Sequence, residues 1–191
     1  MSRRRLDPTT TGAPVPAAMV TCADADGKAN IITIAWTGTI CSTPPMAYIS
    51  VAKPRYSYSL IAERREFAIN LPTKELAYET DFCGVNSGRD VDKFEALGLT
   101  AEEASAIGVP IIKECPVAIE CRLKDIIELG SHDLFIADVV AVDADDAVID
   151  ESGKLRPGKA GLISFVNHEY WALGEKVGYS GYSRKQQRPK G

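Results

Sequence analysis

Two cations and a hydroxyl lie close together where an apolar strand is predicted to give way to a helix. The stretch SVAKPRYSYSLI, residues 50–61, carries Lys53, Arg55 and Ser57 at this corner. A helix N-terminus offers unpaired N–H groups and a partial positive charge, and both favour a bound phosphate. A solvated turn with an N-capping side chain would use similar residue types. From this stretch alone, both interpretations stay open.

A second polar loop, CGVNSGRDVDKF at residues 83–94, precedes another predicted helix. It is not a Walker loop, because the Gly-Lys-Ser/Thr ending is missing. Ser87 could cap that helix while Lys93 faces water, or both could contact a ligand. Cys83 has no histidine beside it in the sequence, so a small buried thiol is expected rather than a nucleophile.

The composition describes an ordinary globular chain with no sign of a nucleic-acid or membrane partner. Hydrophobic residues make up 45% of the 191 positions, the net charge is -4 and the pI is near 5.3. No apolar run is long enough to span a membrane, and the N-terminal stretch lacks the apolar segment of a signal peptide. Five cysteines without a CxxC pair fit neither a disulfide framework nor a zinc site, and no metal is expected. We therefore expect reduced thiols and a cytoplasmic location.

Apolar and β-branched runs predict mostly strands, with short helices between them. The stretch WTGTICSTPP, residues 36–45, is interrupted by glycine and proline and is predicted to be a connection. Long strands with only short helices favour a closed or nearly closed antiparallel barrel. A doubly wound parallel sheet is disfavoured, because helices do not alternate regularly with strands. The predicted strands are 19–23, 30–35, 46–51, 67–71, 117–128, 132–142 and, last, 162–166, and the predicted helices are 56–65, 74–82 and 91–97.

Several separated motifs, taken in order, resemble the flavin reductase-like family and in particular its flavoredoxin branch. The resemblance implies a mainly β, FMN-binding split β-barrel with antiparallel Greek-key strands and short inserted helices. It predicts an N-terminal arm at 1–14, the barrel domain at 15–177 and a basic tail at 178–191. The residues that carry it are Asn30, Thr33, Ala35-Trp36-Thr37, Pro44-Pro45, Ser50-Val51, Arg55, Ser57, Phe67 with Asn70, and the stretches DFCGVNSGRDVDKF, GSHDLFIADV and HEYWALGE.

The resemblance also implies where an FMN would lie. Its phosphate would bind at the corner of Arg55 and Ser57, with Lys53 as a further cation, and its ring would border Trp36 and Thr37. Without the resemblance, Trp36 would be predicted to pack in the barrel core. The complete set of expected cofactor contacts is Asn30, Thr33, Ala35, Trp36, Thr37, Ser50, Val51, Lys53, Arg55, Ser57, Cys83, Ser87, Lys93 and Tyr170.

Two histidines remain, and they are expected to differ. His132 lies in GSH, where the family often has Gly-Asp-His, and is expected to contact the nicotinamide or flavin. Ser131 replaces the acid, so that neighbour brings no negative charge to His132. His168 has no obvious partner and is expected to be exposed.

The resemblance implies a homodimeric oxidoreductase in which a reduced nicotinamide, NADH or NADPH, delivers a hydride to flavin N5. One alternative is a flavoredoxin-like electron carrier whose bound FMN is reduced by a partner protein. The other is a barrel that has lost flavin and binds a different ligand. Since no GxGxxG fingerprint is present, the sequence does not identify the electron donor.

Overall fold

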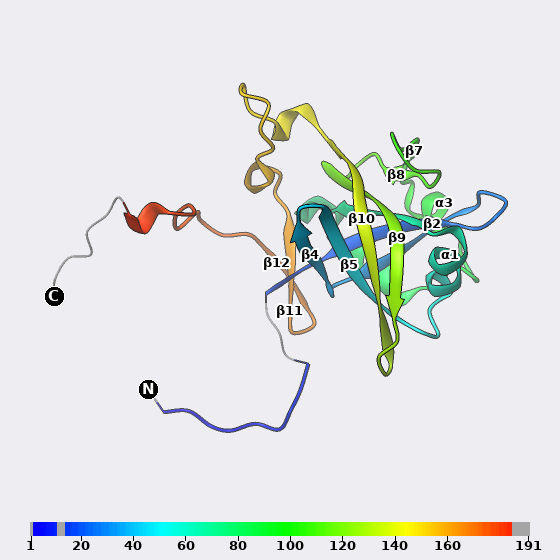
Figure 1. The fold of residues 1–191 in the computed structure, drawn as a ribbon, viewed down its shortest axis with the longest axis horizontal. Coiled ribbons are helices and arrows are strands. Elements are labelled where there is room, and N and C mark those ends of the chain that lie inside the picture. Colours follow the sequence, from blue (N-terminus) through cyan, green and yellow to red (C-terminus); the bar gives the residue numbers. More distant parts are fainter. Residues whose placement is uncertain (1, 11–13, 185–191) are drawn as a thin grey trace.

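A strongly curved antiparallel sheet forms the centre of the molecule (Figure 1). The computed structural model describes residues 2–10 and 14–184. Within these ranges the main sheet has seven strands in the order β3-β2-β6-β9-β10-β5-β4. Its strands are β2 (Ala18–Ala23), β3 (Ala29–Ile34), β4 (Thr37–Ser42), β5 (Pro45–Ala52), β6 (Glu66–Leu71), β9 (Val117–Ile127) and β10 (His132–Ala144).

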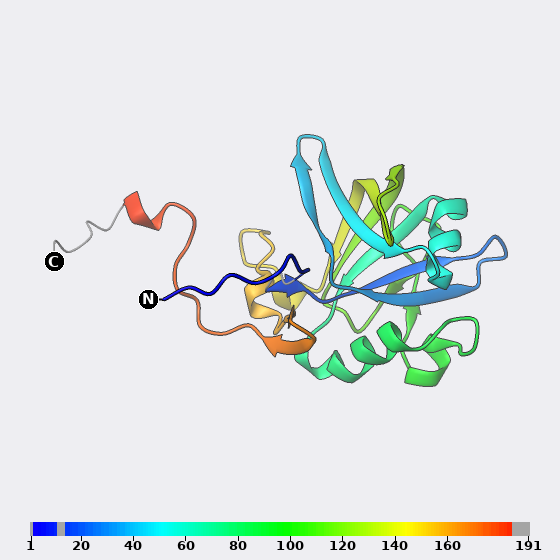
Figure 2. The same cartoon turned by 90° about the horizontal axis from the view of Figure 1, so that it is seen from below.

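The two outermost strands of this sheet, β3 and β4, are consecutive in the chain. Ala35 and Trp36 join them, and the Trp36 carbonyl accepts a hydrogen bond from the Ser50 N–H of β5 at 2.9 Å. The sheet therefore curls until its ends approach each other, and the β4–β5 hairpin rises from one side (Figure 2). The predicted antiparallel split barrel with short helices is confirmed.

Two smaller sheets and a few short helices complete the described chain. The strands β1 (Val15–Pro16), β11 (Ile163–Val166) and β12 (Glu169–Ala172) pair with one another, as do β7 (Ala101–Glu102) and β8 (Ile111–Ile112). The α-helices are α1 (Tyr56–Arg64), α2 (Ala77–Val85) and α3 (Lys93–Leu97), and the 3-10 turns are η1 (Lys74–Leu76), η2 (Asp146–Val148), η3 (Pro157–Lys159) and η4 (Tyr182–Arg184). In the described ranges, no helix is both long and apolar enough to cross a lipid bilayer.

Alternate side chains of the curved sheet fill the barrel, and α1 packs against the same core. Phe67, Phe135 and Ile49 are fully buried there, together with Ile61 of α1. Burial of such large apolar side chains is the main driving force for folding. It fixes the N-terminus of α1 beside the ends of β5 and β3.

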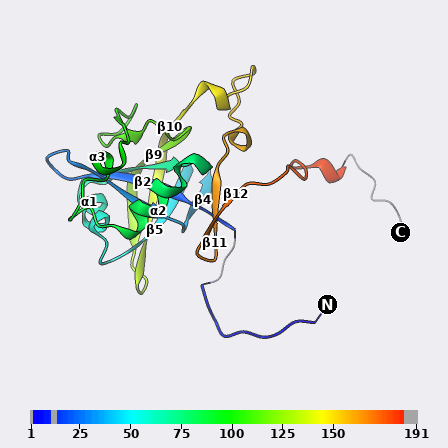
Figure 3. The same ribbon diagram turned by 180° about the vertical axis from the view of Figure 1, so that it is seen from behind.

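Helices α2 and α3 lie on the outside of the barrel, against β2 and β3 (Figure 3). Met19, Ile31 and Cys83 are buried between them. A Cβ added to Gly84 of α2 would lie 3.3 Å from the Thr33 Cβ, so the helix approaches β3 closely. This packing brings the loop after α2 next to the N-terminus of α1.

The sequence prediction missed five strands: β1, β7 and β8, of two residues each, and the longer β4 and β12. The segment predicted as a connection contains β4, an edge strand, where glycine and proline are better tolerated than in a central strand. Gly38 lies under the Tyr48 ring, since a Cβ there would be 3.2 Å from Tyr48 Cε1. The other longer strand that was missed, β12, follows β11 after a turn of two residues.

The predicted N-terminal arm and basic tail both include residues that the structure does not describe. Residues 1, 11–13 and 185–191, which fall in these two segments, lie outside the described residues. Val15 and Pro16 begin the ordered strand pairing, at the predicted start of the domain.

Candidate functional site

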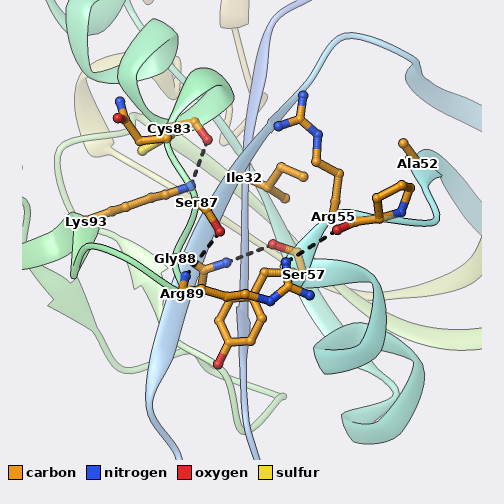
Figure 4. A pocket seen from close by; sticks show the side chains of 13 residues that line it. Ile32, Ala52, Arg55, Ser57, Cys83, Ser87, Gly88, Arg89 and Lys93 are labelled. Carbon is orange, nitrogen blue, oxygen red and sulfur yellow. Dashed lines mark hydrogen bonds between the residues drawn. The ribbon is translucent and has the colours of Figure 1, made fainter.

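A groove opens between the N-terminus of α1, strand β3 and the loop after α2 (Figure 4). Its first part is a cavity of about 320 Å³. The walls combine cationic, hydroxyl and amide side chains with a few apolar ones. The lining residues are Asn30, Ile32, Ala52, Pro54, Arg55, Tyr56, Ser57, Cys83, Asn86, Ser87, Gly88, Arg89 and Lys93.

Three cations of this cavity are Arg55, Arg89 and Lys93. Among the described residues, none of the three has a carboxylate within ion-pairing distance. Arg55 donates to the Gly84 carbonyl at 3.1 Å, and Arg89 lies over the Tyr56 ring at 5.1 Å. Cations that lack a protein counter-charge are suited to an anionic ligand, so we call this part of the groove the cationic end.

Lys93 is buried, with 3% of its surface exposed. Its ammonium donates to the Ile31 carbonyl at 2.6 Å and to the Cys83 carbonyl at 2.8 Å. Burial lowers the pKa of Lys93. Because an ammonium has three donors, two hold β3 and α2 together and the third remains for a ligand in the cavity.

The loop after α2 fits against β3 so tightly that only glycine is accommodated at residue 88. A Cβ on Gly88 would lie 2.1 Å from Asn30 Oδ1. The Asn30 amide in turn donates to Ser57 Oγ at 2.8 Å, and both residues are buried. Asn30 is thus fixed between the loop and the first turn of α1.

The groove continues past Ile32, Ala52 and Arg55 into a second, more aromatic hollow, which we call the ring end. The Trp36 and His132 rings pack against each other there in a tilted arrangement, with centroids 4.8 Å apart. His132 Nδ1 shares a hydrogen bond of 3.0 Å with Ser131 Oγ. Trp36 is 39% exposed, so it is not a core residue. The lining residues are Ile32, Thr33, Ile34, Ala35, Trp36, Ser50, Val51, Ala52, Arg55, His132, Phe165 and His168.

One buried carboxylate links the elements that carry the two ends. Asp133, adjacent to His132, accepts from the Tyr58 hydroxyl of α1 at 2.6 Å and from the Leu129 N–H at 3.0 Å. Lys53, in the turn before Arg55, lies 3.5 Å from the same carboxylate. The hydrogen bond from Tyr58 is the main cause that lowers the pKa of Asp133, and it raises the pKa of Tyr58 to about 12. Asp133 therefore holds α1, the β5–α1 turn and the β9–β10 hairpin in one arrangement.

The structure brings together most of the residues expected to contact the cofactor. Five of them lie at the cationic end, five at the ring end, and Arg55 borders both. His132, expected to contact the nicotinamide or flavin, also lies at the ring end. The residues on the groove are Asn30, Ser57, Cys83, Ser87, Lys93, Arg55, Thr33, Ala35, Trp36, Ser50, Val51 and His132.

The side chains of three expected contacts do not line the groove. Lys53 turns toward Asp133 and Glu128, where it forms ion pairs. Thr37 is buried and donates to the Tyr48 carbonyl at 2.7 Å. Tyr170 packs on the Phe165 ring, its partner on the neighbouring strand, and donates to Asp81 at 3.3 Å.

Other lining residues were not predicted. Arg89 follows Gly88 in the quoted loop, and its charge two positions after Ser87 was a signal that could have identified it. Phe165 gives no such signal, because only the β11–β12 pairing places it on the groove. Ser87 does not cap α3, since Asp92 accepts the capping hydrogen bonds from the Phe94 and Glu95 N–H groups.

The cysteine at the cavity wall, Cys83, is unsuited to redox chemistry. All five lie in the described residues as unpaired thiols. Cys83 is buried at the cavity wall, and burial raises its pKa to about 12, so the thiol stays protonated at neutral pH. The described residues hold no group of three or more His, Cys, Asp or Glu side chains arranged for a metal ion.

Comparison with known proteins identifies the family. The sequence model described as "Flavin reductase like domain" matches residues 11–160. The chain belongs to the flavin reductase-like family. This family contains the branch that the motifs indicated.

Individual relatives and solved structures are also flavin-linked proteins. A solved structure, the flavoredoxin of Desulfovibrio vulgaris (Miyazaki F), is 32% identical, with a TM-score of 0.90, covering 96% of this chain and 100% of that one. An FMN-binding protein from Thermus thermophilus is 25% identical, with a TM-score of 0.78, covering 94% and 99%. An NADPH-flavin oxidoreductase of Streptomyces viridifaciens is 30% identical over 139 residues, which cover 72% of this chain and 70% of that one. These likenesses support a flavin cofactor and a flavin-linked oxidoreductase or electron-transfer function.

Proposed function

We propose that the groove binds FMN, with the phosphate at the cationic end and the isoalloxazine at the ring end. The observation that carries this proposal is the continuity of the two ends through Ile32, Ala52 and Arg55. An FMN molecule has the same polarity, because a dianionic phosphate and a flat aromatic ring lie at opposite ends of a ribityl chain.

The backbone at the cationic end fits a phosphate. Helix α1 has nine residues, and its N-cap, Arg55, makes no side-chain capping hydrogen bond. The Tyr58 N–H donates to the Arg55 carbonyl, and the N–H groups of Tyr56 and Ser57 remain for another acceptor. Arg55 would add a charge-assisted fork, and Ser57 and Ser87 would add hydroxyl donors.

Bound flavin would supply the redox chemistry, while the protein binds it, orients it and adjusts its electrostatics. Trp36 and His132 would border the ring, and backbone groups from Thr33 to Trp36 would face its polar edge. No protein thiolate would take part, because Cys83 is protonated and buried.

An absorption spectrum of the purified protein, followed by titration of flavin-free protein, tests the proposal. FMN is expected to bind more tightly than riboflavin, because only FMN presents a phosphate to Arg55 and Arg89. FAD is the third ligand to titrate. A protein that binds none of these flavins would favour the alternative of a flavin-free barrel.

For the reaction, we propose oxidation of NADH or NADPH with reduction of the bound flavin. The relative named as an NADPH-flavin oxidoreductase supports this activity. The likeness to flavoredoxin supports a second candidate, an electron carrier whose FMN is reduced by a protein. Anaerobic addition of NADH and NADPH to the FMN-loaded protein separates the two, because only the first activity bleaches the flavin without a partner protein.

We also propose that the protein works as a homodimer. Large apolar side chains lie exposed on the β4–β5 hairpin and after β11, and a twofold contact would cover them. They include Ile40 at 45%, Trp171 at 55% and Leu173 at 54% exposure. Sedimentation at micromolar concentration should give about twice the chain mass if this interface forms.

A further inference from the structure

A histidine occupies a turn position where glycine would be the favourable residue. Strands β11 and β12 are joined by Asn167 and His168 alone, between the paired residues Val166 and Glu169. Both turn residues have positive φ, 48° and 70°. A two-residue hairpin turn with positive φ at both positions favours Asn followed by Gly, because a Cβ is strained in that conformation. His168 therefore carries a conformational cost that glycine would avoid.

Contacts within the fold do not explain why this position holds an imidazole. His168 is exposed, as the sequence predicted, and its ring lies edge-on to Phe165 at 6.0 Å. In the described parts of the chain, its imidazole makes no hydrogen bond and no ion pair. A turn that only had to connect β11 and β12 would be more stable with glycine there.

His168 lies where the groove is extended. It borders the ring end together with Trp36 and Phe165, and the same three side chains border an adjoining hollow. These three side chains thus lie between the proposed flavin ring and the adjoining hollow. The other residues around that hollow are Thr9, Thr10, Val15 and Asn167.

The adjoining hollow combines aromatic faces with hydrogen-bonding groups. Trp36 and Phe165 offer surfaces for a flat ring, and aromatic rings favour offset or edge-to-face contact. His168, Asn167 and the two threonines offer donors and acceptors around it. A planar ring that carries a carbonyl or carboxamide fits this chemistry.

We propose that His168 is a specificity-determining residue that contacts the planar redox partner of the bound flavin. This proposal rests on the proposed function. The shared chemistry is a flat ring with a carbonyl or carboxamide group, found in both nicotinamides and quinones. A reduced nicotinamide gives a hydride to the flavin, whereas a quinone takes two electrons and two protons from it. Whether electrons pass to or from the flavin, His168 contributes to binding of the nicotinamide or quinone, and the groove holds the flavin.

The test compares wild-type protein with His168→Gly and His168→Asn, each loaded with FMN. Stopped-flow absorbance follows flavin reduction by NADH and NADPH, and reoxidation of the photoreduced protein by menadione. The Tm and the FMN Kd are measured in parallel. Asparagine tolerates positive φ and keeps a hydrogen-bonding side chain, so it separates loss of the imidazole from loss of all polar contact.

His168→Gly should keep the Tm or raise it by roughly 2–4 °C, since the strain is relieved. The FMN Kd should change less than the half-saturating concentration of the probe, because the charged phosphate contacts at the cationic end are kept while His168 only borders the ring end. The half-saturating concentration of at least one probe should rise by about five- to tenfold, as expected for loss of one polar or aromatic contact. For His168→Asn, the half-saturating concentration of that probe should lie between the values for wild type and His168→Gly.

The proposal would be overturned if each probe had the same half-saturating concentration in wild type and in His168→Gly. It would also be overturned if none of the probes saturated the wild-type protein. A lower Tm with loss of FMN would also overturn it, because His168 would then be structural. Failure of the proposed function would be recognised separately, since wild-type protein would bind no FMN in the first titration.

Discussion

The Cβ position of Gly88 lies only 2.1 Å from the Oδ1 atom of Asn30. Any larger residue at position 88 must push the loop after α2 away from β3, or displace Asn30 from its hydrogen bond with Ser57. The first movement would separate the loop that carries Ser87 and Arg89 from the N-terminus of α1, and the second would break the link between β3 and the first turn of α1. The cationic end thus keeps its shape because residue 88 has no side chain.

Gly88→Ala is therefore expected to weaken FMN binding by about tenfold or more, the effect of misplacing one or two charge-assisted hydrogen bonds. Fluorescence titration of the flavin-free protein measures this change. Gly158→Ala is the matched control, because a Cβ on Gly158 has no neighbour within 4 Å and its φ is not positive. Equal FMN affinity in wild type and Gly88→Ala would show that the loop does not contact the ligand.

The carboxylate of Asp133 should stabilise the fold in a pH-dependent way. Its pKa is lowered in the folded state, chiefly by the hydrogen bond from Tyr58, so it contributes stability above its unfolded pKa near 4. That contribution is lost as the pH falls through the lower, folded pKa. We expect Asp133→Asn to lower the Tm by several degrees at pH 7, with a smaller difference from wild type below about pH 3.5.

Thermal unfolding monitored by circular dichroism across this pH range checks the expectation. Asp138→Asn serves as control, because Asp138 forms only a 3.3 Å ion pair with Lys124 whose side chains are 43% and 51% exposed. A Tm difference between Asp133→Asn and wild type that stays constant from pH 3 to pH 7 would contradict a charged role for Asp133.

Cys83→Ser tests whether the thiol at the cavity wall matters for electron transfer. Because the pKa of Cys83 is raised to about 12 by burial, no thiolate is present at neutral pH. The variant should bind FMN within about threefold of wild type, since serine preserves size but adds a stronger hydrogen-bonding hydroxyl. Under anaerobic conditions its flavin should still be reduced by whichever of NADH and NADPH reduces the wild type, and it should be reoxidised in air, as the spectrum would record. Bound flavin that neither bleaches nor recovers would assign the thiol a redox role.

The sequence predicted the strand-to-helix corner because the residue types change abruptly there. An apolar strand, a proline and a run of hydroxyl residues locate the N-terminus of α1 at Tyr56, as observed. The side-chain directions at the same corner were not predictable. Lys53 and Arg55 are two positions apart in a turn, and the ion pairs of Lys53 with Asp133 and Glu128 explain why Lys53 leaves the groove.

The ring end was predicted less completely, because it is built by pairing between distant segments. Trp36 and His132 were identified from motifs, but Phe165 reaches the groove through the β11–β12 hairpin. Tyr170, which is paired with Phe165, packs on the Phe165 ring and donates to Asp81 instead of lining the cavity. Local sequence carries little information about such partners, since strand order and register depend on the whole sheet.

The affinities of FMN and riboflavin for wild-type protein and Arg55→Ala test the central claim most directly. Titration of each flavin-free protein gives the four dissociation constants, Tm confirms folding, and Arg3→Ala, an exposed arginine of the N-terminal arm, is the control. If the phosphate lies at the cationic end, Arg55→Ala should raise the FMN Kd by about 10- to 100-fold and the riboflavin Kd by less than about threefold. Equal weakening of both ligands would contradict the account, because the phosphate would then bind elsewhere.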